Sequence, residues 1–183
     1  MVDNRKDVST KTQYYNASNN PFYRMFHNKR YAQASVAYLK AGQNREAAIC
    51  DAYLLREKAW SIPTTASEAR IQALISAANA FITCAQDSPS DEVNERLDCY
   101  GIAAKCYSKA RQLKNAGDNY QMAEQYAAAA RTYREGGHFD EMVEVITLHA
   151  NALDSGLLER LKTIAQMHYF KVSFDSRLVS EYF

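Results

Sequence analysis

Apolar side chains recur every three or four residues along most of this chain, and no segment alternates strictly between apolar and polar positions. The first pattern is typical of helices that bury one face, whereas half-buried strands would show the second. The sequence therefore predicts an all-α protein. The predicted helices span about residues 21–40, 45–60, 67–86, 92–111, 113–124, 125–136, 138–151 and 155–171.

Local signals set several of the predicted helix ends. Pro21 suits the first helical position, where its missing N–H costs nothing. Gly42 and the pair at 136–137 suit helix C-termini, where a left-handed residue is common. Pro63 ends the second helix, and Ser67 is expected to cap the third with its hydroxyl.

A triplet of residues recurs along the chain: a small residue, an aromatic residue four positions later, and a second small residue three positions after that. These spacings place all three side chains on one helical stripe. Small residues let a neighbouring helix approach closely, and the aromatic ring fills the space between the helices. The copies are Ala34–Tyr38–Ala41, Ala77–Phe81–Cys84, Ala103–Tyr107–Ala110, Ala116–Tyr120–Ala123 and Ala129–Tyr133–Gly136.

Two copies also carry a turn, in residues 38–47 and 131–142. These stretches resemble the tetratricopeptide (TPR) repeat, which has an aromatic residue late in its first helix, Gly four residues later and a small or apolar residue opening its second helix. The 34-residue period of that family is missing, since Ala77, Ala103 and Ala129 recur every 26 residues. The resemblance implies a degenerate TPR-like α-solenoid of antiparallel helix pairs, as also found in the SNAP-type membrane-fusion adaptors.

A narrower resemblance covers roughly residues 22–175. Segments 41–59, 137–143 and 169–171 are similar to parts of large fungal proteins that join a UvrD-type helicase core to helical repeats, often described as TPR-and-ankyrin-repeat-containing. This implies that the chain is a repeat segment or a stand-alone relative. The chain has no GxxxxGK[ST] phosphate loop, so ATP hydrolysis is not carried over.

The expected organisation is one TPR-like repeat domain at 21–175, between a flexible N-terminal segment at 1–20 and a C-terminal tail at 176–183. No run of about 18 apolar residues occurs, so no membrane span is expected. The polar N-terminus has no apolar segment behind it, which predicts an intracellular protein, cytoplasmic or nuclear.

The overall charge is +1, which argues against a dedicated nucleic-acid binder. The distribution is less even, because residues 1–45 hold eight Lys or Arg and two acidic residues, whereas residues 46–100 hold four basic and nine acidic residues. Nucleic acid is therefore a partner to consider, but it is not favoured.

Catalytic and metal-binding patterns are missing from the sequence. Cys50, Cys84, Cys99 and Cys106 lie in apolar helical patterns without CxxC spacing, so we expect them to pack in the core. The acidic cluster at 140–144 falls at a predicted helix start, where the helix dipole stabilises negative charge. We predict no enzyme activity, no cofactor and no metal.

The tyrosines of the triplets are expected in the core. Trp60, at a helix end, is expected in the core or as a cap between repeats. Tyrosines off the stripe, and arginines near them, are natural anchors for a bound peptide, because Tyr, Trp and Arg dominate interface hot spots. The sequence thus predicts a non-catalytic scaffold that binds a protein or peptide. The alternatives are an accessory nucleic-acid-associated module of a UvrD-type helicase-like protein, or a regulatory part of an enzyme. The candidate partner-binding residues are Tyr23, Arg30, Tyr31, Tyr53, Arg56 and Tyr126.

Overall fold

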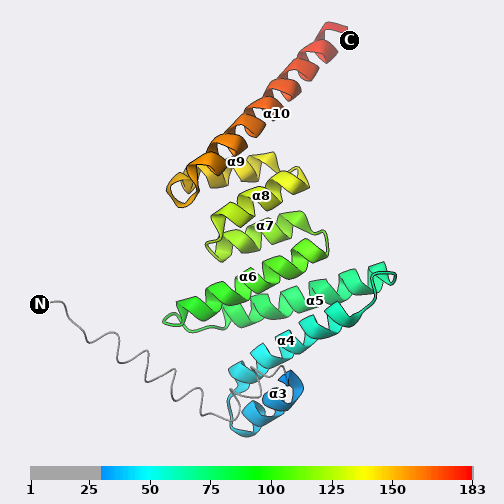
Figure 1. Ribbon diagram of the computed structural model, residues 1–183, viewed down its shortest axis with the longest axis vertical. Coiled ribbons are helices and arrows are strands. Elements are labelled where there is room, and N and C mark those ends of the chain that lie inside the picture. Colours follow the sequence, from blue (N-terminus) through cyan, green and yellow to red (C-terminus); the bar gives the residue numbers. More distant parts are fainter. Residues whose placement is uncertain (1–29, 183) are drawn as a thin grey trace, which may run out of the picture. The chain divides into compact units, whose positions relative to one another are not determined.

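The computed structural model describes the backbone of residues 30–182 and the side chains of residues 30–171. This part of the chain is helical and contains no strand (Figure 1), so the all-α prediction is confirmed. The helices are α3 (Tyr31–Lys40), α4 (Asn44–Ser61), α5 (Ser67–Gln86), α6 (Val93–Lys109), α7 (Leu113–Met122), α8 (Tyr126–Gly136), α9 (Phe139–Leu148), the short 3-10 helix η1 (Ala150–Ala152) and α10 (Ser155–Tyr182).

The chain divides into two compact units, of which the first ends at Asp87 and the second begins at Ser88. This boundary lies in the loop between α5 and α6. In the first unit α4 packs against both α3 and α5. In the second unit each helix from α6 to α10 packs against the next one along the chain.

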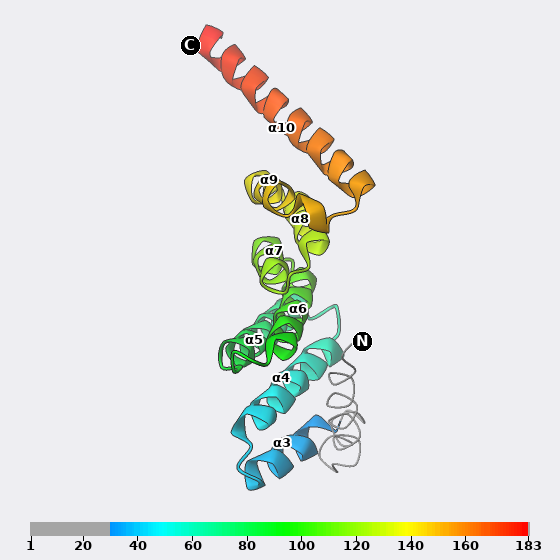
Figure 2. The ribbon, with the colours of Figure 1, turned by 90° about the vertical axis from the view of Figure 1, so that its left-hand side faces the viewer.

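The helices of the second unit lie in two layers, with α6 and α8 in one and α7 and α9 in the other (Figure 2). Its core at the α8–α9–α10 end is built from large side chains with almost no exposed surface. Tyr133, Met142, Val145 and Leu161 are each at most 1% exposed. The helices α8, α9 and α10 therefore share one apolar core.

The triplets bury their first small residue in every copy, whereas the second small residue is exposed at Ala41 and half-buried at Gly136. The first residue of all five copies, from Ala34 to Ala129, is 0% exposed, as expected for a small residue packed against a neighbouring helix. Among the aromatic members, Phe81, Tyr107 and Tyr133 are buried, and Tyr38 and Tyr120 are half-buried. The prediction of buried tyrosines is confirmed for Tyr107 and Tyr133.

Four of the five triplets also end in the same backbone turn. The residue after the second small residue has a left-handed conformation, with φ of 75° at Gly42, 59° at Arg111, 56° at Glu124 and 75° at Gly137. The next residue's N–H then donates to the carbonyl of the triplet's tyrosine, which satisfies an otherwise orphaned helix carbonyl. These bonds are Gln43 to Tyr38 (2.9 Å), Gln112 to Tyr107 (3.0 Å), Gln125 to Tyr120 (2.8 Å) and His138 to Tyr133 (2.9 Å).

The turns give the second unit a shorter repeat than the sequence suggested. Arg111, Glu124 and Gly137 follow one another at intervals of 13 residues, each interval holding one helix and one turn. The 26-residue recurrence is therefore a pair of such intervals. The Phe81 copy differs, because α5 continues past it to Gln86 and its C-cap Asp87 keeps a right-handed conformation.

Several predicted helix ends need correction. The predicted Ser67 cap is wrong: Ala66 occupies the N-cap position, and Ser67 is already the first helical residue. α6 ends at Lys109 rather than at Arg111, because Arg111 adopts the left-handed turn conformation. α10 runs on to Tyr182, since no Gly or Pro follows Gly156, so the expected tail is helical over 176–182. The expected flexible segment at 1–20 and the first helix start lie outside the described residues.

Ring contacts join α10 to α9. His168 stacks on Phe139 with ring centroids 3.9 Å apart, and the Tyr169 hydroxyl donates to the Asp140 carboxylate. α10 has 28 residues and α9 only 10, so the C-terminal part of α10 extends past its neighbour (Figure 1).

Candidate interaction surface

One face of α4 carries Tyr53, Arg56 and Trp60. Their spacings of three and four residues bring the three side chains together along the helix. The helix forms because residues 44–61 contain four alanines and no Gly or Pro, and it ends where Ile62 becomes extended before Pro63. Trp60 therefore stands in the last turn, where it is 44% exposed.

The three side chains form a layered contact. The guanidinium carbon of Arg56 lies 4.6 Å from the ring centroid of Tyr53 and 4.7 Å from that of Trp60. Both distances are within the range of a cation–π interaction. The Arg56 side chain keeps only 15% of its surface exposed. Arg56 is thus fixed by two rings on its own helix.

Neighbouring helices hold Tyr53 in place. Tyr31 of α3 stacks on its ring at a centroid distance of 5.1 Å and an interplanar angle of 19°. Phe81 of α5 meets it edge-on at 5.0 Å and 87°. Burial raises the pKa of Tyr31, and the nearby Arg56 guanidinium opposes that rise. We name the residues Tyr31, Tyr53, Arg56 and Trp60 the Tyr–Arg–Trp surface.

A second arginine reaches the Trp60 end of this surface. Arg70 of α5 donates from Nη1 to the backbone carbonyls of Trp60 and Ile62, two groups that α4 itself leaves unbonded at its C-terminus. Arg56 donates from Nη2 to Glu57 at 3.1 Å, and its Nε is buried without a partner among the described residues. Arg56 therefore contacts the Trp60 ring, and Arg70 contacts the backbone at the end of α4.

Three of the predicted partner-binding residues, Tyr31, Tyr53 and Arg56, meet here, although Tyr31 is buried, with 6% of its surface exposed, and supports Tyr53 by stacking on its ring. Arg30 is exposed and directly precedes Tyr31 in the chain. Tyr126 is not part of it, because it lies in the second unit and stacks on His149 at 3.7 Å. Tyr23 lies outside the described residues.

Two residues of the surface were missed from the sequence. Trp60 was predicted in the core or as a cap between repeats, and its side chain is 44% exposed rather than in the core. The spacing of Trp60 from Tyr53 and Arg56 was the available signal. Arg70 carries no such signal, since its contact depends on how α5 returns along α4.

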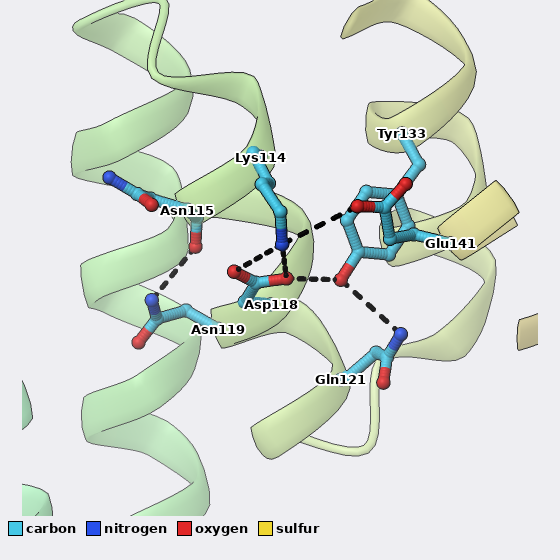
Figure 3. A network of polar contacts seen from close by, with 7 residues as sticks. All are labelled: Lys114, Asn115, Asp118, Asn119, Gln121, Tyr133 and Glu141. Carbon is cyan, nitrogen blue, oxygen red and sulfur yellow. Dashed lines mark hydrogen bonds and ion pairs between the residues drawn. The ribbon is translucent and has the colours of Figure 1, made fainter. Parts of the chain in front are cut away.

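A second cluster of aromatic and charged groups joins α7, α8 and α9 (Figure 3). The Tyr133 hydroxyl donates to Asp118 Oδ1 at 2.6 Å and accepts from Gln121 Nε2 at 3.3 Å. Lys114 Nζ lies 3.4 Å from Asp118 and 3.5 Å from Glu141 Oε1. Glu141 is in the first turn of α9, as the sequence predicted for this acidic cluster.

The interior of this cluster is closed to ligands. Tyr133 is 1% exposed, and a Cβ at Gly117 would lie 2.3 Å from its ring, so glycine is required there. Burial and the hydrogen bond to Asp118 raise the pKa of Tyr133 far above its usual value. The hydroxyl therefore keeps its proton and serves as a buried donor that holds α7 against α8.

The cysteines and the acidic residues give no reactive centre in the described part of the chain. All four cysteines are buried and none forms a disulfide. Burial raises the pKa of the Cys50 thiol to about 11, which keeps it protonated at neutral pH. No group of three His, Cys, Asp or Glu among the described residues could hold a metal ion. Nor does any helix found there have the length and apolarity to cross a membrane.

Comparisons with protein-family models, with curated proteins and with solved structures find no match to this chain. The resemblances to TPR repeats and to helicase-associated repeats therefore stay predictions, and the surface itself is the basis for a functional conclusion.

Proposed function

We propose that this chain is a non-catalytic helical-repeat scaffold that binds a protein or peptide through the Tyr–Arg–Trp surface. The observation that carries the proposal is the layered contact of Tyr53, Arg56 and the exposed Trp60. These are the three residue types most enriched at interface hot spots.

The surface is also preorganised. Arg56 lies between two rings and Tyr53 is held by Tyr31 and Phe81, so these side chains have little rotamer freedom left to lose on binding. Immobilising a free side chain costs about 0.5–1.5 kcal/mol in an association. A partner that binds to this surface therefore avoids most of the cost of immobilising Tyr53 and Arg56.

The helical arrangement supports a scaffold role of the TPR-like kind. Consecutive helices pack against each other within each unit, and the same tight turn closes four of the triplets. Stacked helix pairs of this type present extended faces that bind peptides or helices. A TPR-like solenoid is the architecture that we infer from this pattern.

A nucleic-acid role is less well supported by the described residues. α4 carries Arg45, Arg56 and Lys58 but also Glu46, Asp51 and Glu57. A groove that follows a phosphate backbone needs a run of positive charge. The balanced charge of α4 favours a protein partner instead.

Site-specific crosslinking tests this function. A photoreactive residue at exposed Ser61, next to Trp60, should crosslink one defined protein in cells that express the chain. The same residue at Leu148, which is 68% exposed in the second unit, is the matched control. Adding Trp60→Ala should abolish the Ser61 crosslink and leave any Leu148 crosslink unchanged. Equal crosslinking with and without Trp60 would refute the proposal.

A further inference from the structure

The end of α4 presents positive charge beside an exposed aromatic ring. Arg56 stacks on the Trp60 ring, and Arg70 bonds to the Trp60 carbonyl. Among the described residues, the carboxylate partner of these two guanidinium groups is Glu57, which pairs with Arg56 alone. Arg70 therefore retains donors and a charge that no described carboxylate neutralises.

The arginine and the indole bind different parts of a ligand. Arginine forks bind carboxylates through paired N–H donors, and an exposed indole covers apolar side chains. We propose that the Trp60 end of the Tyr–Arg–Trp surface binds an acidic peptide segment in which a carboxylate lies next to an apolar side chain. This inference rests on the proposed function and names the partner's chemistry.

The roles within the surface follow from the geometry. Arg70 supplies the charge for the carboxylate from its position at the Trp60 carbonyl, Trp60 supplies the apolar contact, and Arg56 orients the indole by stacking on its ring. Tyr53 and Tyr31 position Arg56 and do not need to touch the peptide. Removing the carboxylate should therefore weaken binding as much as removing Arg70.

The chain carries its own reporter for this test, because Trp60 is its one tryptophan. A peptide of about 12 residues that mixes Glu with Leu and Phe should shift the Trp60 emission in a saturable way. The same peptide with Gln in place of Glu should bind about tenfold more weakly, as expected for the loss of one charged hydrogen bond. Full-length protein is used throughout.

Two variants test whether the charge of Arg70, rather than any positive charge near the end of α4, is needed for binding. Arg70→Gln should weaken the Glu peptide about tenfold, measured by anisotropy of a labelled peptide, and should leave the Gln peptide unchanged. Lys58→Gln is the matched control, because it removes one positive charge from α4 two residues before Trp60 and so on a different side of the helix. It should not affect either peptide. Circular dichroism checks that both variants fold.

Several results would overturn the inference. These are equal affinity for the Glu and Gln peptides, no response of Trp60 to the Glu peptide, or tighter binding of a short oligothymidylate with steep salt dependence. If the Glu peptide fails while the Ser61 crosslink still requires Trp60, the partner chemistry is wrong and the binding surface stands. If both fail, the proposed function fails as well.

Discussion

Two clusters in this molecule combine aromatic rings with charged groups, and burial separates them. In the second unit, Tyr133 is 1% exposed and its hydroxyl is bonded to Asp118 and Gln121. In the first unit, Trp60 is 44% exposed, its ring stacks on Arg56, and its backbone carbonyl accepts from Arg70. Each polar group at the Tyr133 hydroxyl has its partner inside the fold, whereas the Trp60 end keeps unused donors and open aromatic surface.

This difference in burial explains how similar residue types acquire different roles. A buried aromatic residue with satisfied hydrogen bonds stabilises the fold, and its loss is felt in the free energy of unfolding. An exposed aromatic residue that is held in place can contribute to binding instead. The two clusters should therefore respond to substitution in different measurements.

The largest expected effect is at Tyr133. Tyr133→Ala should lower the free energy of unfolding by about 3–5 kcal/mol, as for truncation of a buried aromatic residue. Tyr107→Ala, at the equivalent triplet position, should have an effect of the same size. Urea titrations followed by circular dichroism measure both. If either variant unfolds within about 1 kcal/mol of the wild type, that ring is not part of the core.

Gly117→Ala should destabilise by about 2 kcal/mol, although alanine normally favours a helix interior. The added Cβ would lie 2.3 Å from a ring that the hydroxyl bonds hold in place. Gly101→Ala is a useful control, because the nearest atom there is the end of the flexible Gln125 side chain at 2.8 Å. A larger loss at Gly101 than at Gly117 would contradict the close packing inferred for Tyr133.

Tyr133 should also make stability sensitive to high pH. Its pKa is raised by burial and by Asp118, so its contribution is complete below the unfolded value near 10 and is lost as the pH rises above it. The slope for this one proton approaches about 1.4 kcal/mol per pH unit. Urea unfolding between neutral and alkaline pH should show a shallower slope for Tyr133→Phe. An unchanged slope would exclude Tyr133 as a source.

Trp60→Ala should cost only about 1 kcal/mol of stability, because the indole is partly exposed and its cation–π contact is weak at the surface. Peptide binding and the Ser61 crosslink should nevertheless be lost. A loss of binding with little loss of stability would distinguish Trp60 most clearly from the buried Tyr133. A loss as large as that of Tyr133→Ala would place Trp60 with the structural residues.

The smallest expected effect is a gain. Glu124 has a φ of 56°, a conformation that strains residues with a Cβ, so Glu124→Gly should stabilise by about 0.5 kcal/mol. Arg111→Gly should gain less, because Arg111 also pairs with Glu135. Thermal melts of the two variants measure the difference. Destabilisation by Glu124→Gly would mean that the turn gains more from its side chain than it loses to strain.

The sequence predicted the parts of the fold that depend on local spacing. The alanines that open the triplets are buried because a four-residue step keeps them on one helix face, whatever the neighbours are. The turns at Arg111 and Glu124 were not predicted as left-handed, since neither residue type favours that conformation. Packing on both sides of the turn overrides this local preference.

The candidate surface was predicted only in part, for a related reason. Tyr53 and Arg56 share a helix with Trp60, so spacing alone brings them together. The contacts of Arg70 with α4 and of Tyr133 with Asp118 join residues on different helices, 8–10 and 15 positions apart. The packing of neighbouring helices decides such contacts, and no local pattern encodes it.

The 13-residue interval between Arg111, Glu124 and Gly137 makes the second unit modular. Each interval adds one helix and reverses the chain, so two intervals return it to its starting direction. Duplicating or deleting 26 residues would keep every remaining helix in its layer, whereas a change of 13 residues would exchange the layers for all that follow. Gene duplication could therefore lengthen this unit in even steps, and a protein engineer could shorten or extend it by the same rule.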